Sequence, residues 1–228
     1  MSKQRMAHVE ILPAILVKNS AEFHEKLRII EPHVSWAHLD VMDGKFVPNV
    51  TWGDPGDLMH TRTSLHIEAH LMVERPEAAY RDWILAGARR LVWHYEATRQ
   101  HRDIAQDIRA RGAQAGIALN PETGLDAVTP LLSEIDMVLI MANTPGLGGQ
   151  EFRPETPEKI RALRRLWPDG MIGVDIGVRL ETARAAVEAG ADILVAGSFV
   201  FNSESPAKAI EELRASLPQS YGDHQKRD

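Results

Sequence analysis

The sequence has no cysteine. Disulfides and thiolate metal sites are therefore excluded, and any bound metal must be held by His, Asp or Glu. It also has no apolar run long enough to span a membrane, and its first ten residues lack the apolar core of a signal peptide. Basic residues form no stripe and the net charge is -6, so a nucleic-acid partner is not expected. These absences favour a cytoplasmic enzyme or binding protein that acts without membrane or nucleic acid.

Segments typical of strands alternate with segments typical of helices along the whole chain. With 228 residues, 44% of them hydrophobic, the chain is long enough for one large domain. Eight strand–helix units, with no glycine-rich fingerprint after the first strand, favour a closed single-domain (β/α)8 TIM barrel over a doubly wound open sheet. We assign residues 1–218 to the barrel and 219–228 to a polar C-terminal tail. The expected strands are 9–17, 36–42, 65–72, 90–96, 114–120, 137–142, 171–178 and a segment within 191–201.

The second expected strand places a histidine and a carboxylate on one face. Residues two apart on a strand share a face, so His38 and Asp40 lie together. His70 and Asp175 lie near the carboxyl ends of the third and seventh strands, the end where barrels build their sites. Two imidazoles and two carboxylates suit one divalent transition metal, such as Zn²⁺, Mn²⁺, Fe²⁺ or Co²⁺. Taken alone, the first pair is equally a core histidine bonded to a carboxylate.

Glycines follow several of the expected strands at the same mouth. Loops after the seventh and eighth strands are the usual phosphate-binding elements of this fold, with backbone N–H groups as donors. A flexible turn is the alternative interpretation of the glycine-rich stretch after the sixth strand. Its glycines also predict that residues 143–152 form a mobile lid over the phosphate. The residues assigned to the phosphate site are Gly146, Gly148, Gly149, Gly177, Gly197 and Ser198.

A metal beside two carboxylates and a phosphate site fits enolisation of a phosphorylated ketose. The metal polarises the carbonyl, one carboxylate removes the α-proton, and the other returns a proton to the opposite face. Three methionines at strand ends, Met42, Met72 and Met141, have the parity to face the mouth. Their polarizable sulfur suits the environment of an ene-diolate, although methionine is more often core filler.

The segment HLDVMDGKFVPN at 38–49 is long and specific, and shorter motifs lie at 70–72, 93–96, 144–150, 174–177 and 196–198. In these segments the chain resembles the ribulose-phosphate 3-epimerase family, over about residues 11–201. The resemblance implies interconversion of D-ribulose 5-phosphate and D-xylulose 5-phosphate by proton abstraction and return at C3 through an ene-diolate. It also implies Asp40 and Asp175 as the acid–base pair, one divalent metal held by them with His38 and His70, and phosphate bound by the glycine amides. The expected partner is a small phosphorylated ketose, and we expect a homo-oligomer.

Four departures from the family pattern bear on the substrate. Ala14 stands in place of a serine, Asn143-Thr144 is shifted relative to the family's asparagine, Ile176 replaces a glycine, and Trp52 adds bulk to a loop. A 3-epimerase of another ketose phosphate (allulose 6-phosphate or a tetrulose phosphate) is therefore an alternative. A catalytically silent sugar-phosphate-binding barrel is another. Strand parity predicts that the side chain of Ile176 points away from the barrel axis, toward the covering helices.

Overall fold

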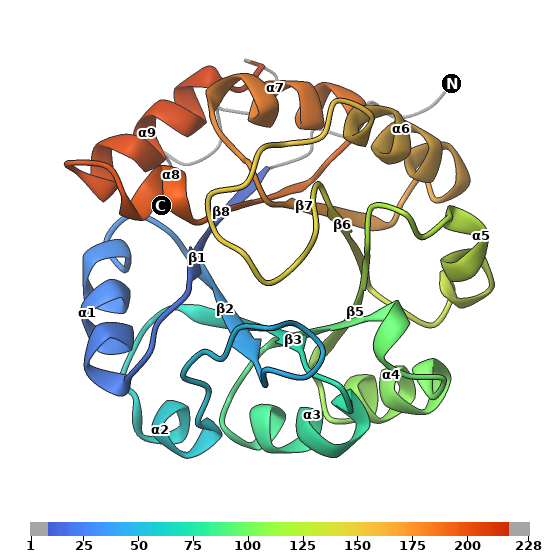
Figure 1. The fold of residues 1–228 in the computed structure, drawn as a ribbon, viewed down its shortest axis with the longest axis horizontal. Coiled ribbons are helices and arrows are strands. Elements are labelled where there is room, and N and C mark those ends of the chain that lie inside the picture. The colour runs from blue at the N-terminus through green and yellow to red at the C-terminus, as the bar shows by residue number, and fades with distance from the viewer. Residues whose placement is uncertain (1–8, 219–228) are drawn as a thin grey trace.

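Eight parallel strands pair in chain order, and the last pairs with the first, so that the sheet closes into a barrel. The computed structural model describes residues 9–218. Figure 1 looks along the barrel, with the strands at the centre and the helices around them. The molecule is a single-domain TIM barrel, as the sequence predicts. The strands are β1 (Glu10–Ile15), β2 (Trp36–Met42), β3 (His66–Met72), β4 (Arg90–His94), β5 (Gln114–Leu119), β6 (Met137–Met141), β7 (Met171–Asp175) and β8 (Ile193–Ala196).

Helices on the outside connect successive strands and cover the sheet (Figure 1). In the first of them, Phe23, Leu27 and Ile30 are buried, a spacing of four and three residues that puts all three on one helix face. The helices are α1 (Ser20–Ile30), α2 (Pro55–His60), α3 (Pro76–Leu85), α4 (His101–Ala110), α5 (Leu125–Val128), α6 (Thr156–Leu166), α7 (Leu180–Ala189), α8 (Ser198–Phe201) and α9 (Pro206–Ser216), with 3₁₀ turns η1 (Tyr95–Ala97) and η2 (Thr129–Leu131).

Apolar side chains fill both sides of the sheet. The larger cluster lies between strands and helices and includes Trp83 and Trp93. A smaller cluster joins residues of β1, β4, β5, β6 and β8, among them Leu12, Leu139 and Val195. Strands this far apart around the ring meet only inside the barrel, so the interior is a packed core with no open pore.

The strand register brings the predicted site residues side by side. Asp40 on β2 is the neighbour of His70 on β3. Across the barrel, Met141 on β6 is the neighbour of Asp175 on β7. The parallel arrangement places all these carboxyl ends at one mouth, because every strand runs in the same direction.

Several strands end earlier than the sequence predicts, and two of these differences bear on the site. The strand expected over 90–96 ends at His94 and continues as the 3₁₀ turn η1. The strand expected over 171–178 ends at Asp175. Because β7 ends at Asp175, the side chain of the next residue, Ile176, does not point in the direction that strand parity predicts. No helix within residues 9–218 is long and apolar enough to cross a bilayer, and the tail predicted at 219–228 lies outside the described residues.

Candidate active site

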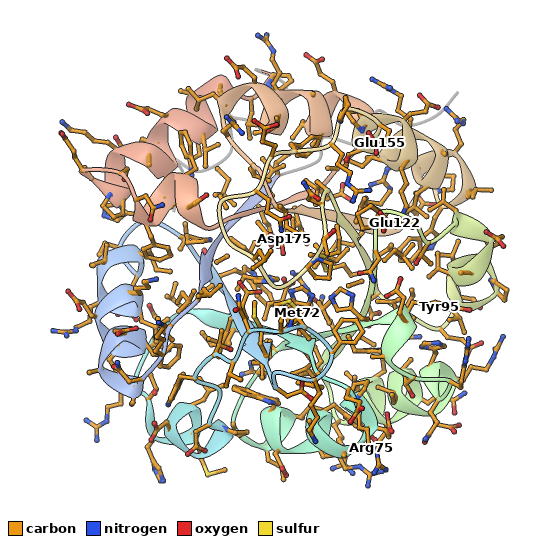
Figure 2. All side chains as sticks on the ribbon, viewed as in Figure 1. Met72, Arg75, Tyr95, Glu122, Glu155 and Asp175 are labelled. Carbon is orange, nitrogen blue, oxygen red and sulfur yellow. The ribbon has the colours of Figure 1, made fainter. Side chains whose placement is uncertain are left out.

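A pocket of about 340 Å³ opens at the carboxyl ends of the strands. Asp175 and Met72 come from different sides of the ring of strands. Figure 2 shows both near the centre of the molecule, whereas Arg75 lies at its rim. The pocket gathers residues from β1, β2, β3, β6, β7 and β8, from the segments that follow β1, β6, β7 and β8, and from α1. Of the residues predicted from the sequence, it is lined by Asp40, Asp175, Met42, Met72, Met141, Gly146, Gly148, Gly149, Gly177, Gly197 and Ser198.

Four buried side chains at the base of this mouth form a cluster that can hold a metal ion. One atom from each of His38, Asp40, His70 and Asp175 lies within 4.8 Å of the others. Asp40 Oδ1 is 3.2 Å from His38 Nε2 and 3.2 Å from His70 Nδ1. The two ring nitrogens are themselves 3.1 Å apart. Two nitrogen and two oxygen donors facing one point fit a divalent transition metal.

The outer nitrogen of His38 is held by a buried carboxylate. His38 Nδ1 lies 2.5 Å from Glu68 Oε1, so it carries a proton, and Nε2 is the nitrogen that faces the cluster. Arg90 donates to the other Glu68 oxygen at 2.7 Å. Burial alone raises the pKa of Glu68, but the hydrogen bond from His38 and the charge of Arg90 lower it to about 2. A charged triad thus fixes the orientation of one candidate ligand.

The outer nitrogen of His70 meets a third histidine. His70 Nε2 is 3.0 Å from His94 Nε2, and the two rings stack with their centroids 5.0 Å apart. Burial lowers the pKa of His94 to about 4, so this ring is neutral. If His70 donates from Nε2 to His94, its Nδ1 is free toward the cluster. The second His94 nitrogen, Nδ1, lies 3.4 Å from Glu96 Oε2, outside hydrogen-bond geometry.

The two carboxylates of the cluster sit in different electrostatic environments. Burial raises the pKa of Asp40, but its contacts with the rings of His38 and His70 outweigh burial and hold the pKa below its usual range. Burial, together with the negative charge of Asp40, raises the pKa of Asp175 to about 7. Asp175 Oδ1 accepts one hydrogen bond from the Ile176 amide at 2.7 Å. Two carboxyl groups with pKa values pushed apart are typical of acid–base sites.

The pocket also exposes free backbone donors. Within residues 9–218, the amides of the six residues assigned to phosphate from the sequence donate no hydrogen bond to the protein. Gly177 needs to be glycine, because a Cβ there lies 2.4 Å from the Phe152 nitrogen and its φ is +69°. The loop after β6 can therefore approach the end of β7 closely. This arrangement can bind the oxygens of an anion.

A model of the ribulose-phosphate 3 epimerase family matches residues 10–201. The ribulose-phosphate 3-epimerase of Schizosaccharomyces pombe is 37% identical over 217 residues, which cover 93% of this chain and 95% of the relative. This chain belongs to the ribulose-phosphate 3-epimerase family. A cytoplasmic isoform from Oryza sativa is 37% identical over 220 residues (94% and 96% covered), and a chloroplastic relative from Arabidopsis thaliana is 40% identical over 215 residues (90% and 76%).

The solved structure of a 3-hexulose-6-phosphate synthase superposes with a TM-score of 0.69 at 16% identity, over 92% of this chain and all of the other (100%). At that identity the likeness concerns the barrel fold alone. The assignment to the epimerase family therefore rests on the sequence matches.

Ile176, where the family pattern has glycine, lines the pocket and packs against the cluster inside the barrel. The prediction that it faces the helices is wrong. Strand parity does not extend to it, because β7 ends at Asp175 and the Ile176 backbone turns to a φ of +77°. A β-branched side chain disfavours this left-handed conformation, so the replacement brings both strain and bulk to the epimerase pocket.

The other departures from the family pattern lie in different places. Ala14 lines the pocket beside Gly197. Trp52 does not line it; its ring packs on Phe23, 4.6 Å away, under the covering helices. The side chain of Asn143 also lies outside the pocket, where it donates to the Glu151 carbonyl at 2.9 Å. Of the four departures, only Ala14 and Ile176 border the substrate space directly.

Sequence reasoning missed several residues that the structure brings to the site. Glu68 shares the polar face of its strand with His70, and that parity could have identified it. Arg90 gives no such signal, because the sequence does not reveal the register of β4 against β3, which makes Arg90 the direct neighbour of Glu68 on the adjacent strand. Lys26, which also lines the pocket, belongs to a helix and carries no motif.

Proposed function

We propose that this protein is a metal-dependent epimerase that interconverts D-ribulose 5-phosphate and D-xylulose 5-phosphate. The observation that carries the proposal is the convergence of two carboxylates, Asp40 from β2 and Asp175 from β7, within one cluster at the pocket. Epimerisation needs two such groups, because the proton leaves C3 on one face and returns on the other. Family membership supports the same chemistry.

Asp40 and Asp175 would act as the acid–base pair. In one direction one of them removes the C3 proton and the other delivers a proton, and the roles exchange in the reverse direction. Met42, Met72 and Met141 would surround the planar ene-diolate with apolar, polarizable sulfur.

His38, Asp40, His70 and Asp175 would hold one divalent transition metal. Such an ion supplies Lewis-acid polarisation of the ketose carbonyl and stabilises negative charge on the substrate oxygens. The imidazole nitrogens favour Zn²⁺, Mn²⁺, Fe²⁺ or Co²⁺ over Mg²⁺. Glu68 and His94 would keep both histidines in the tautomers that ligation needs.

The amides of the six phosphate-site residues would bind the substrate phosphate. Their donors come from three loops, after β6, β7 and β8, so the phosphate would draw these loops together. This contact would hold the sugar with C3 between the two carboxylates. Remote binding of this kind positions the reacting carbon and supports turnover.

The proposal is tested by following solvent deuterium into the ketose. Wild-type protein should incorporate deuterium at C3 while converting D-ribulose 5-phosphate to D-xylulose 5-phosphate. Asp40→Asn and Asp175→Asn should each lower turnover by at least about a hundredfold, the contribution of a general acid or base. Metal content is measured in both variants, because each residue is also a proposed ligand. Quantitative retention of the substrate's own hydrogen would refute the two-base mechanism.

A second candidate is the 3-epimerisation of a different ketose phosphate. The positions of Ala14 and Ile176 support this second candidate, since both line the pocket and both differ from the family pattern. Turnover of ribulose 5-phosphate, allulose 6-phosphate and a tetrulose phosphate by one preparation separates the two candidates. The substrate with the highest kcat/KM is the assigned one.

We further propose that the barrel domain spans residues 1–218 and that the protein is a cytoplasmic homo-oligomer. The cytoplasmic rice relative supports this compartment, although the Arabidopsis relative is chloroplastic. Light scattering of the purified protein tests the oligomer, and fractionation of the source cells tests the compartment.

A further inference from the structure

Lys26 projects from α1 toward the mouth of the barrel. Among the residues that line the pocket within 9–218, it is the one with a cationic side chain. Ser198 and Phe201, which begin and end α8, line the same pocket. Gly197 and Ser198 were assigned to phosphate from the sequence, whereas no motif or family pattern assigned Lys26.

The ammonium group of Lys26 is held in place. Its Nζ donates to the Leu16 carbonyl at 3.0 Å and lies 4.6 Å from the centre of the Phe201 ring. An ammonium has three N–H donors, and the carbonyl uses one of them. Because Leu16 and Phe201 both border the pocket, the remaining donors lie at its edge. Burial lowers the pKa of Lys26, and the nearby charges of Glu22 and Asp40 oppose that shift.

The side chains that line the pocket include more acidic groups than basic ones. Its other charged lining groups are Asp40 and Asp175, both acidic. Backbone amides offer oriented dipoles to a phosphate but no net charge. The proposed metal would offset the two carboxylates at the base of the pocket, so a doubly charged phosphate at the Gly197–Ser198 side still lacks a positive charge at its own binding point unless a side chain supplies one.

We propose that Lys26 binds the phosphate group of the substrate, at the Gly197–Ser198 side of the pocket. The proposal rests on the proposed function, because it takes the substrate to be a phosphorylated ketose. Lys26 would add a charge-assisted hydrogen bond to those of the amides. It would also distinguish phosphorylated from free sugars more strongly than neutral donors can.

A purely structural role is the competing explanation, in which Lys26 only ties α1 to the Leu16 carbonyl. Lys159 provides a matched control for that role. It is also a half-buried helical lysine, and its Nζ donates to the Asn120 and Pro121 carbonyls at 2.8 and 3.1 Å. Lys159 does not line the pocket. Replacing either lysine by methionine removes a carbonyl contact and a charge while keeping most of the volume.

The test compares Lys26→Met with Lys159→Met and wild type. Binding of inorganic phosphate is measured by titration calorimetry, and kcat/KM is measured for D-ribulose 5-phosphate and for free D-ribulose. Lys26→Met should weaken phosphate binding at least about tenfold, the effect of one lost charge-assisted hydrogen bond. The ratio of kcat/KM for phosphorylated over free sugar should fall by a similar factor, mainly through KM. Lys159→Met should change neither quantity by more than about twofold.

Two results would overturn the proposal. Unchanged phosphate affinity in Lys26→Met would show that the ammonium does not contact phosphate. An equal loss for phosphorylated and free sugar, with phosphate binding intact, would assign Lys26 a structural role. The calorimetric arm needs no turnover, so its result stands even if wild-type protein binds phosphate and epimerises no ketose phosphate. That last outcome would refute the proposed function alone.

Discussion

Ile176 is the one residue other than glycine within 9–218 whose φ is positive, at +77°. A β-branched residue in this conformation costs on the order of 1–3 kcal/mol. Its N–H donates to Asp175 Oδ1 at 2.7 Å, and its side chain packs on the cluster inside the barrel. The strain therefore sits between a proposed acid–base residue and a proposed phosphate donor.

The order of stability of two variants tests this conformation. At most positions alanine is more stable than glycine, because glycine loses more backbone entropy on folding. At position 176 we expect Ile176→Gly to be more stable than Ile176→Ala by about 1 kcal/mol, since only glycine tolerates the left-handed region freely. Urea unfolding of both variants measures the difference.

Ile29 is the matched control, because it is a partly exposed isoleucine near the end of α1. There the alanine variant should be more stable than the glycine variant by about 1 kcal/mol. If alanine is also the more stable choice at position 176, the backbone at Ile176 is not left-handed in solution.

Glu68 is the next residue whose role can be measured. Loss of its contact with His38 should lower metal affinity, because the ligand loses its fixed tautomer and orientation. We expect Glu68→Gln to weaken metal binding by about 10–100-fold, as measured by competition with a chromogenic chelator.

Glu10→Gln is the control for the contact between Glu68 and Arg90. Glu10 contacts Arg90 at 3.5 Å, and its side chain is about one-third exposed. That variant disturbs Arg90 without touching His38, so its metal affinity should stay within about twofold of wild type. Equal losses in both variants would assign the effect to the general charge balance of the barrel interior.

At the scale of elements, the sequence identifies all eight strands, because apolar periodicity and glycine punctuation mark each unit. It misplaces ends where a local residue decides them. The sequence predicts one helix over about residues 124–133, yet α5 stops at Val128 and a 3₁₀ turn follows. Pro130 lies in that turn and has no N–H for a further helical bond. The short α8 falls within the segment expected to contain the last strand.

The sequence likewise predicts the site residues that lie on strands but not those that lie beyond strand ends or on helices. His38, Asp40, His70 and Asp175 were predictable because strand parity and the carboxyl-end rule fix where such residues point. Parity fails one residue beyond the strand, which is why the orientation of Ile176 was predicted wrongly. Lys26 was missed because a helix residue reaches the pocket only through the packing of α1 against the barrel, which periodicity does not encode.

The loop over 143–152 arches over the barrel mouth in Figure 1. It is joined to the loop after β2 by a hydrogen bond of 2.5 Å from the side-chain nitrogen Nδ2 of Asn49 to the Gly146 carbonyl. Gly146 has a φ of +94°, and a Cβ there lies 2.6 Å from Val47 Cβ. The two loops therefore meet at a position that accepts only glycine without adjustment.

Gly146→Ala should push these loops apart and lower kcat/KM for the sugar phosphate by about tenfold, the effect of roughly 1.4 kcal/mol of strain. Gly148→Ala is the comparison within the same loop, since a Cβ at that position meets nothing within 4 Å. We expect a smaller loss there. A larger loss for Gly148→Ala would show that the contact with Val47 does not position the loop.

That the loop is a mobile lid stays a prediction, which limited proteolysis with and without sugar phosphate can check.

At the scale of the whole molecule, a metal bound by His38, Asp40, His70 and Asp175 would link strands β2, β3 and β7. Such an ion binds the folded barrel and stabilises it against unfolding. At a metal concentration about 1,000 times Kd, the gain is about 4 kcal/mol. We expect removal of metal with a chelator to lower Tm, and addition of Zn²⁺, Mn²⁺, Fe²⁺ or Co²⁺ to restore it.

His70→Ala is the control for that measurement, because it lacks one donor of the cluster. Its Tm should respond little to chelator or to added metal. A wild-type Tm that is the same in chelator and in metal, with metal absent by elemental analysis in both, would contradict the proposed site.

The closure of the sheet sets the order in which this protein becomes functional during its synthesis. Glu10 to Pro13 on β1 pair with Ile193 to Ala196 on β8. The first strand to leave the ribosome must therefore wait for almost the entire chain, about 180 residues, which takes ~10–40 s at typical translation rates. Gly197 and Ser198 follow directly after that seam. A growing chain thus presents His38 and His70 early and the last two of its proposed phosphate donors only after the closing strand, so a chain stopped before β8 would lack both a closed barrel and part of the proposed phosphate site.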